Sequence, residues 1–391
     1  MPGLLLRSTR ASDVRRKIET MKAAIGNPRV LIVGAGPAGL AAAAELARSG
    51  VSDVLIIDRD DSPGGLPRFC HHPGFGLEYA RWPYSGPAFA KKMLGQLQDT
   101  PVRISMGTTL LSIENGPVCE VIGPEFGHAQ LEPQVVIVAT GIREANRGNR
   151  VVPGVRPAQG ILTTGLLQQL VHRNVSLPSY LRRLVVVGTE HVSFSAILTA
   201  RHAGIRVVAL IGADERVQSY SAAGWLARAL GINIHLRSEI VSIAGTSERV
   251  EAVRVRKDRV TRDIACDGVL FSAGWIPETV ALANGPMLID AMTKGPIVDQ
   301  AMRTSIPGVF AAGNVLRGVE TSGFAALEGK RAGAMAAMAV AGKIPSGQAR
   351  ETRKMAQSRV PQHWDHSLPE PLELSDRWRP ARFRDAYERQ T

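Results

Sequence analysis

Short apolar runs followed by glycine-rich turns recur along the 391-residue chain. The first run, Val30–Val33, precedes the turn Gly34–Gly39 and then an alanine-rich segment. The next run, Val54–Ile57, ends at Asp58. Uninterrupted apolar runs of this length are typical of strands that are buried on both faces of a parallel sheet. The pattern predicts a strand, a tight turn, a helix and a second strand.

A second set of apolar runs begins about 150 residues later, at Leu184–Val187 and Gly188, and continues at Val207–Ile211. Ile232–Ile234 and the alternating segment Val250–Arg256 follow. Two such units in one chain predict an α/β fold with two Rossmann-like dinucleotide-binding domains.

A third block, Gly308–Asn314, again combines an apolar strand with a glycine turn. It precedes a segment rich in alanine and glycine, Phe324–Ala341, for which we expect one helix.

Both ends of the chain carry extensions with a different pattern. Residues 1–27 hold an apolar stripe at helical spacing with Asp13 as a cap, so we predict a helical arm whose stripe is Val14, Ile18, Met21 and Ile25. Residues 342–391 are rich in Arg, Pro and Gln, contain Trp364 and Trp378, and are expected to form an extended tail. Since tryptophan and arginine are enriched at interfaces, we predict that both extensions become ordered against other subunits.

Composition and charge narrow the function classes. The net charge of +12 lies largely in the extensions, because residues 1–27 carry six basic against two acidic side chains and residues 342–391 carry ten against seven. This excess of positive charge is compatible with docking to an acidic protein partner, but we interpret it as a solvated surface. The sequence contains no recognised nucleic-acid-binding module. No apolar run reaches the roughly 18 residues of a membrane helix, and no signal peptide is apparent. With three scattered cysteines, we expect a cytoplasmic protein without a metal site.

The first turn has the spacing of a dinucleotide-binding fingerprint. Gly34 permits the tight turn, Gly36 lets the backbone approach a pyrophosphate, and Gly39 lets the helix pack against the strand. Asp58 follows Gly34 by 24 residues, about the spacing of a carboxylate that binds a ribose. The N-terminus of the helix offers free N–H groups to the phosphates. The chain is therefore predicted to bind a dinucleotide here.

The order of these motifs over residues 28–341 resembles the flavoproteins with two dinucleotide-binding domains, the thioredoxin reductase-like pyridine nucleotide oxidoreductases. Besides Gly34–Gly39 and Asp58, the matching segments are Ala139-Thr140-Gly141, Gly274-Trp275-Ile276-Pro277-Glu278 and Ala312-Gly313-Asn314. The resemblance implies bound FAD in a split domain, residues 28–150 and 285–341, with an inserted NAD(P)-type domain at 151–284. The cofactor-binding residues that it implies are Gly34, Gly36, Pro37, Ala38, Gly39, Asp58, Arg59, Gly65, Leu66, Arg68, Leu110, Ala139, Thr140, Gly141, Gly313, Asn314 and Thr321.

The same resemblance implies that the helix after Gly313 directs its positive end at the flavin pyrimidine ring, near Glu320-Thr321-Ser322. A helix dipole at that point would stabilise negative charge on reduced flavin. Asn314 replaces the aspartate of many relatives and retains hydrogen-bonding capacity. The segment Gly64–Gly76 would run beside the flavin, where Cys70 and His72 form either a redox or proton-transfer pair or, as we favour, a buried and inert pair.

Two departures from the family pattern decide the predicted function. Since the closest cysteines in sequence, Cys70 and Cys119, are 49 residues apart, the chain lacks the cysteine pair of a disulfide reductase. The second turn, Gly188–Ser193, carries Glu190 at its second glycine position, where a side chain obstructs the pyrophosphate. A like-charge pair at about 4 Å would weaken binding by about 4 kcal/mol, nearly a thousandfold.

The ribose position of the second unit also lacks an acidic group, because its strand ends at Ile211-Gly212-Ala213. Asp214 and Glu215 follow slightly later and leave NAD as an option, whereas nothing indicates NADP. We predict that this domain is degenerate and serves as scaffold and subunit interface.

The segments Gly64–Gly76, Ser85–Ala90 and Leu162–Gly165 resemble the FAD subunits of opine oxidase, hydrogen cyanide synthase and amino acid dehydrogenase complexes. This implies an FAD subunit that works beside a partner flavoprotein to oxidise an amine, amino acid or small hydroxy compound. The chain has no cysteine after Ala273, so any iron–sulfur cluster would belong to another subunit. The alternatives are a stand-alone NAD(P)H-dependent flavin oxidoreductase and a structural FAD-containing scaffold. No catalytic residue is predicted.

Overall fold

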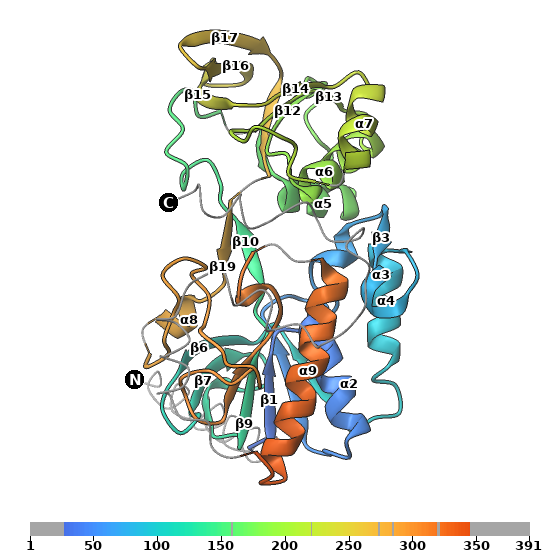
Figure 1. Ribbon diagram of the computed structural model, residues 1–391, viewed down its shortest axis with the longest axis vertical. Coiled ribbons are helices and arrows are strands. Elements are labelled where there is room, and N and C mark those ends of the chain that lie inside the picture. The colour runs from blue at the N-terminus through green and yellow to red at the C-terminus, as the bar shows by residue number, and fades with distance from the viewer. Residues whose placement is uncertain are drawn as a thin grey trace, which may run out of the picture.

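The computed structural model of the protein describes residues 27–344 apart from residues 158, 220, 273, 284, 319 and 320. It has two lobes joined by a narrow connection (Figure 1). The predicted helical arm, with its stripe Val14, Ile18, Met21 and Ile25, lies outside the described residues, as do Glu320 and the tail with Trp364 and Trp378.

The first lobe is built on a five-stranded sheet in which every neighbouring pair is parallel, in the order β20-β9-β1-β2-β5. Its strands are β1 (Val30–Val33), β2 (Val54–Asp58), β5 (Arg103–Met106), β9 (Val135–Val138) and β20 (Val309–Ala311). All four residues of β1 and of β9 are buried, as expected for central strands of a parallel sheet that is covered on both faces.

The second lobe repeats this arrangement with the order β11-β18-β12-β13-β14, again with parallel neighbours. Its strands are β11 (Ile161–Thr163), β12 (Arg183–Val187), β13 (Arg206–Ile211), β14 (Asn233–His235) and β18 (Gly268–Phe271). In sequence, all five lie between β9 and β20 of the first sheet. The predicted fold class, an α/β fold with two Rossmann-like domains, is confirmed; the predicted domain limits stay a prediction.

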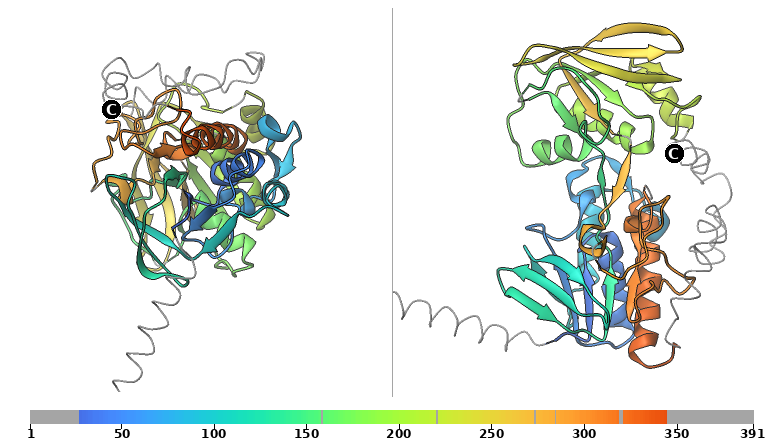
Figure 2. Two further views of the ribbon diagram at one scale, coloured as in Figure 1. Left: turned by 90° about the horizontal axis from the view of Figure 1, so that it is seen from below. Right: turned by 90° about the vertical axis from the view of Figure 1, so that its left-hand side faces the viewer.

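Smaller antiparallel sheets extend both lobes. They pair β3 (Pro73–Phe75) with β4 (Tyr84–Ser85), β6 (Thr109–Ile113) with β7 (Cys119–Gly123) and β8 (Gly127–Leu131), and β15 (Ser238–Gly245) with β16 (Val250–Lys257) and β17 (Val260–Ala265). The connection between the lobes is the antiparallel pair of β10 (Ile142–Glu144) and β19 (Trp275–Pro277), seen between the lobes in both side views (Figures 1 and 2).

The helices are α2 (Pro37–Arg48), α3 (Leu77–Ala80), α4 (Gly86–Gly95), α5 (Thr164–His172), α6 (His191–His202), α7 (Ser221–Ala229), α8 (Val280–Ala283) and α9 (Ser322–Val340), with the short 3-10 helices η1 (Leu66–Phe69) and η2 (Gly313–Val315). Of these, the sequence predicts α2 and α6, which follow the two glycine turns, and α9. Helices α2 and α9 pack closely, because a Cβ at Gly329 or Gly333 would collide with the backbone of α2. This close contact brings the turn after β1 next to the turn after β20.

Candidate functional site

The first glycine turn joins β1 to α2 and is fixed by contacts that only glycine allows. Gly34 has φ +114°, and a Cβ there would collide with the carbonyl oxygen of Ala139. A Cβ at Gly39 would collide with the carbonyl oxygen of Gly34. The turn therefore packs directly on the end of β9, and two of its three glycines are required by the chain's own backbone.

The second glycine of this turn is not crowded in this way. A Cβ at Gly36 would meet only the Cα of Gly65, at 3.9 Å, whereas a Cβ at Gly65 would lie 2.8 Å from the Cα of Gly36. Gly36 is the N-cap of α2, with Pro37 as the first helical residue and neither a side-chain cap nor an acidic residue in the first turn of this helix. The N–H groups at this helix end are thus left for an anion, and the glycine cradle fits a pyrophosphate.

Asp58 closes β2 beside this turn. Its Oδ2 accepts a hydrogen bond from the backbone N–H of Ala35 at 2.6 Å, and its Oδ1 accepts one from the N–H of Asp60 at 2.9 Å. Because a carboxylate has about four acceptor positions, both oxygens retain capacity for ribose hydroxyls. The two backbone bonds fix the direction in which the carboxylate points.

The third predicted segment meets the same place. A Cβ at Gly313 would lie 2.8 Å from the Cβ of Ala38 in α2, and the N–H of Gly313 donates to Glu328 Oε2 at 2.9 Å. Ala38, Ala139 and Ala325 form a small buried cluster. Four segments that are distant in the sequence therefore lie together around the first glycine turn: those at residues 34–39, 65, 139 and 313.

The remaining predicted residues differ in their surroundings. Thr140 Oγ1 donates to the carbonyl of Glu278 at 2.8 Å, Gly141 accepts from the N–H of Glu278, and Arg59 pairs with the Glu278 carboxylate at 3.0 Å. Sequence reasoning does not assign this linking role to Glu278, whose only sequence signal is its place at the end of a matching motif.

Arg68 faces its own loop rather than open space. Its Nη2 lies 2.7 Å from the carboxylate of Asp60, and its guanidinium stacks over the ring of Phe69 at 4.5 Å. Leu110 lies in the apolar core of the first lobe, Leu66 is exposed, and Asn314 is part of η2. Thr321 is the N-cap of α9 and accepts from the N–H of Phe324. Cofactor contacts of these residues stay predictions.

The second turn joins β12 to α6 and differs at the position of Gly36. Gly188 has φ +139°, so the tight turn is retained, but the N-cap of α6 is Glu190. The Glu190 carboxylate accepts a hydrogen bond from Trp275 Nε1, on β19, at 2.6 Å. Burial raises the pKa of Glu190 to about 7, and the nearby Asp214 adds to the rise against the opposing effects of Trp275 and Arg150.

A pKa of about 7 lowers the charge that the sequence alone assigns to Glu190. Because burial moves this pKa toward neutral pH, the repulsion of a pyrophosphate is weaker than a full charge would give. The side chain nevertheless occupies the place where the first turn has only hydrogen, and it is held there by Trp275. The obstruction of a pyrophosphate by this side chain stays a prediction, and we expect it to be mainly steric at this pH.

The ribose position of the second unit can be located by register. The N–H of Gly34 donates to Ile57, the residue before Asp58, and the N–H of Gly188 donates in the same way to Ile211. The counterpart of Asp58 is therefore Gly212. A Cβ at Gly212 would lie 2.7 Å from Cγ2 of Thr189, so Thr189 fills the space that a longer side chain would need.

Comparisons with known proteins identify the family of this chain. A sequence model described as pyridine nucleotide-disulphide oxidoreductase matches residues 28–339. The chain belongs to this family. A subunit of alkyl hydroperoxide reductase from Pseudomonas putida is 28% identical over 301 residues, covering 73% of this chain and 53% of that protein. This chain thus spans about half the length of that relative.

Two further matches agree. A ferredoxin–NADP reductase of Salinispora arenicola (strain CNS-205) is 25% identical over 290 residues, covering 73% of this chain and 85% of that protein. The crystal structure of T. acidophilum thioredoxin reductase superposes with a TM-score of 0.65 at 24% identity, covering 79% of this chain and 97% of that chain, which shows the fold. The chain is an oxidoreductase and a flavoprotein whose cofactor is FAD.

Although the family name refers to disulphides, all three cysteines are buried and free. Burial raises the pKa of the Cys70 thiol to about 12, and its Sγ lies 3.6 Å from the carbonyl oxygen of Leu66. A thiol with this pKa is protonated at neutral pH and is a poor nucleophile. Of the two roles left open for Cys70, the structure favours the inert one.

The other half of the predicted pair belongs to the contact between the lobes. His72 Nε2 lies 2.5 Å from Ser195 Oγ in α6, which also accepts a hydrogen bond from Gln168 Nε2 at 2.8 Å. His71 Nε2 lies 3.0 Å from Nδ1 of His172 in α5. The segment after η1 therefore rests on the inserted lobe through polar contacts.

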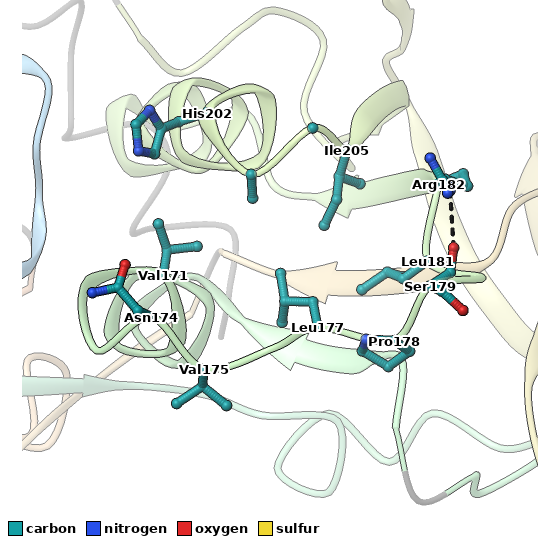
Figure 3. Close-up of a pocket in the computed structure, with 12 residues that line it drawn as sticks. Val171, Asn174, Val175, Leu177, Pro178, Ser179, Leu181, Arg182, His202 and Ile205 are labelled. Atoms are coloured by element: carbon teal, nitrogen blue, oxygen red, sulfur yellow. Dashed lines mark hydrogen bonds between the residues drawn. The ribbon is translucent and has the colours of Figure 1, made fainter.

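A groove of about 420 Å³ lies at the amino ends of β12 and β13, whereas the glycine turn follows the carboxyl end of β12 (Figure 3). Figure 3 shows Val171, Asn174 and Val175 around the end of α5 facing His202 at the end of α6, with Leu177 and Ile205 to the right of both helix ends. Both helices end at this groove, so it lacks the helix N-terminus that favours a phosphate at the first glycine turn. Among the described residues there is no group of three metal-ligating side chains and no helix long and apolar enough to cross a membrane.

Proposed function

We propose that this chain is the FAD-binding subunit of a multi-subunit dehydrogenase or oxidase, in which a partner subunit oxidises an amine, amino acid or small hydroxy compound. The observation that carries the proposal is the second turn. Glu190 fills its pyrophosphate position and is bound by Trp275, and Gly212 supplies no acceptor for a ribose. Because this route for electrons from NAD(P)H is obstructed, a partner is the source that remains.

The residues proposed to hold FAD are those that converge at the first turn. Backbone at Gly34, Gly36 and Gly65 would face the pyrophosphate, together with the free N–H groups of α2, and Asp58 would accept from ribose hydroxyls. When bound, FAD supplies one- and two-electron redox chemistry. The chain contributes orientation and a fixed electrostatic surrounding for it.

Two features support assigning no disulfide reductase activity. The three cysteines are free, and burial raises the pKa of the thiols of Cys70, Cys119 and Cys266 to about 12 each. Flavin-linked disulfide exchange needs a cysteine pair and a reactive thiolate.

The second candidate is a stand-alone NAD(P)H-dependent flavin oxidoreductase. It is favoured by the retained geometry of the second turn, with Gly188 at φ +139° and a helix of 12 residues after it. Ferredoxin–NADP reductase, the printed name of one relative, points in the same direction.

One experiment separates these proposals. The full-length chain with bound FAD is mixed anaerobically with millimolar NADH or NADPH, and the absorbance of oxidised flavin is followed. We expect slow or no bleaching, with full bleaching by dithionite. Rapid stoichiometric bleaching by either nucleotide would establish the second candidate, and a flavin that even dithionite leaves oxidised would indicate a structural scaffold.

Glu190→Gln and Glu190→Gly form a matched pair for the same measurement. Glu190→Gln keeps the size of the side chain and removes its charge, whereas Glu190→Gly removes both. If the obstruction is steric, only Glu190→Gly accelerates bleaching by NADH.

A further inference from the structure

Glu328 is a charged residue in the buried face of α9. Its exposed fraction is 0%, and every other buried residue of this helix is alanine or glycine. A fully buried carboxylate is expensive to desolvate unless it is paired and hydrogen-bonded. Its partners therefore indicate what it does.

The two oxygens of Glu328 have different partners. Oε1 pairs with the guanidinium of Arg317, whose exposed fraction is 4%, and Oε2 accepts the N–H of Gly313 at 2.9 Å. Arg317 follows η2 by two residues, so both partners lie on the turn that leaves β20. The carboxylate thus fastens this turn to α9 at two points.

The turn held by Glu328 also contacts the helix that follows the first glycine turn. Gly313 packs against Ala38, and Gly329, next to Glu328, packs against the backbone of the same residue. Ala38 follows Gly36 by two residues in the first turn of α2. A displaced Gly313 turn would therefore push directly on the helix end proposed to bind the pyrophosphate.

Stability alone does not account for an ion pair at this place. Apolar residues of similar volume often replace a buried ion pair at equal or better stability. What an apolar residue lacks is an acceptor for the N–H of Gly313, which is buried at this point.

We propose that Glu328, neutralised by Arg317, is a positioning residue of the FAD site: it holds the Gly313–Asn314 turn against α2, so that the site is formed before FAD binds. This inference rests on the FAD placement proposed above. A site formed in advance binds without the ordering cost that a mobile turn would add.

The test uses two charge-free double variants of the full-length chain. Arg317→Met with Glu328→Gln keeps an oxygen that accepts from Gly313, whereas Arg317→Met with Glu328→Leu removes it. We expect the Gln variant to bind FAD within about threefold of the natural chain and the Leu variant to bind at least about tenfold more weakly, because a buried N–H is left without a partner. Affinity is measured by flavin fluorescence, and thermal unfolding of the FAD-depleted chain is measured beside it.

The matched control removes an ion pair of the inserted lobe, Arg183–Asp267, in which the carboxylate also accepts two backbone N–H groups. Arg183→Met with Asp267→Leu should lower the unfolding temperature and leave the FAD affinity unchanged. Equal FAD affinity of the Leu and Gln variants at residue 328 would overturn the inference. Retained FAD in Gly36→Glu would instead overturn the placement of the cofactor.

A second measurement keeps the inference testable if the Leu variant does not fold. Hydrogen exchange of the Gly313 amide is followed in the natural chain with and without FAD. Protection that is already present in the FAD-depleted chain supports a preformed turn. Protection that appears only after FAD is added would contradict it.

Discussion

The two glycine turns of this protein share one backbone plan and differ in what occupies it. Each turn follows a buried parallel strand and begins at a glycine with positive φ. In each turn the N–H of this glycine donates to a carbonyl oxygen of the neighbouring strand, from Gly34 to Ile57 and from Gly188 to Ile211. At the position predicted to face the pyrophosphate, the first turn has Gly36, whose Cβ would meet no atom closer than 3.9 Å, and the second has Glu190, bound to Trp275.

The difference also extends to the ribose position. Asp58 ends the second strand of the first unit, whereas Gly212 stands at the same register in the second, with Thr189 filling the space beside it. A Rossmann-like fold can therefore keep its sheet, turn and helix while the side chains at these two positions differ. Function has to be argued from the side chains at the turn rather than from the fold.

The largest expected effect comes from giving the first turn the residue of the second. Gly36→Glu should lower FAD affinity by roughly a thousandfold, because a carboxylate at about 4 Å from a phosphate costs about 4 kcal/mol at an effective dielectric near 20. The purified variant should be colourless. Gly95→Ala, at a glycine of α4 with open space around its Cβ position, is the control and should stay yellow.

The reverse exchange should build a nucleotide site in the second turn. Thr189→Ala, Glu190→Gly and Gly212→Asp together remove the obstruction and supply a carboxylate at the register of Asp58. We expect NADH to bind at least about tenfold more tightly than to the natural chain, measured by calorimetry. If the triple variant binds NADH no better, side chains beyond these three block the site.

A smaller effect concerns pH. Since the pKa of Glu190 rises from its ordinary value of 4.5 to about 7, the folded chain holds this proton more tightly than the unfolded chain does. This contribution to stability is complete below pH 4.5 and is lost as the pH rises through 7, by about 3 kcal/mol at most. Denaturant unfolding of the natural chain should therefore lose stability relative to Glu190→Gln between pH 5 and 8. A pH-independent difference between the two would contradict the raised pKa.

The smallest effect is expected at Cys70, which lies close to the contact between the lobes. Cys70→Ala should leave FAD affinity and the rate of flavin reduction by dithionite within about twofold, because a thiol with a pKa of about 12 is not a thiolate at neutral pH. Alkylation of the folded natural chain by iodoacetamide should be slow for the same reason. A large loss of reduction rate in the variant would restore the redox role.

Sequence reasoning predicted the parallel strands, the first turn and α9 well, because buried runs such as Val135–Val138 and glycine spacing are local signals. The family resemblance supplied FAD and the set of segments around Ala139 and Gly313. Contacts between distant residues were beyond its reach. The bonds of Glu328 to Gly313 and of Trp275 to Glu190 join positions 15 and 85 residues apart, and no local pattern specifies them.

The charge of Glu190 is a second property that the sequence alone cannot predict. The sequence singles out Glu190 as the counterpart of Gly36, but the charge of its side chain depends on burial and on neighbours such as Asp214, which only the fold brings together. Arg68 is likewise among the cofactor-binding residues that the resemblance implies, while its guanidinium pairs with Asp60 in the structure.

The antiparallel pair β10 and β19 has a mechanical consequence. Glu144 and Trp275 are cross-strand partners, and both form hydrogen bonds with the inserted lobe. Glu144 accepts from the N–H groups of Thr164 and Gly165, and Trp275 donates to Glu190. At the other end, Gly141 is bonded to Glu278, which pairs with Arg59 of the first lobe. The β10–β19 pair is thus fixed to the inserted lobe by hydrogen bonds. Any rotation of one lobe relative to the other would therefore occur about the Gly141 end of this pair.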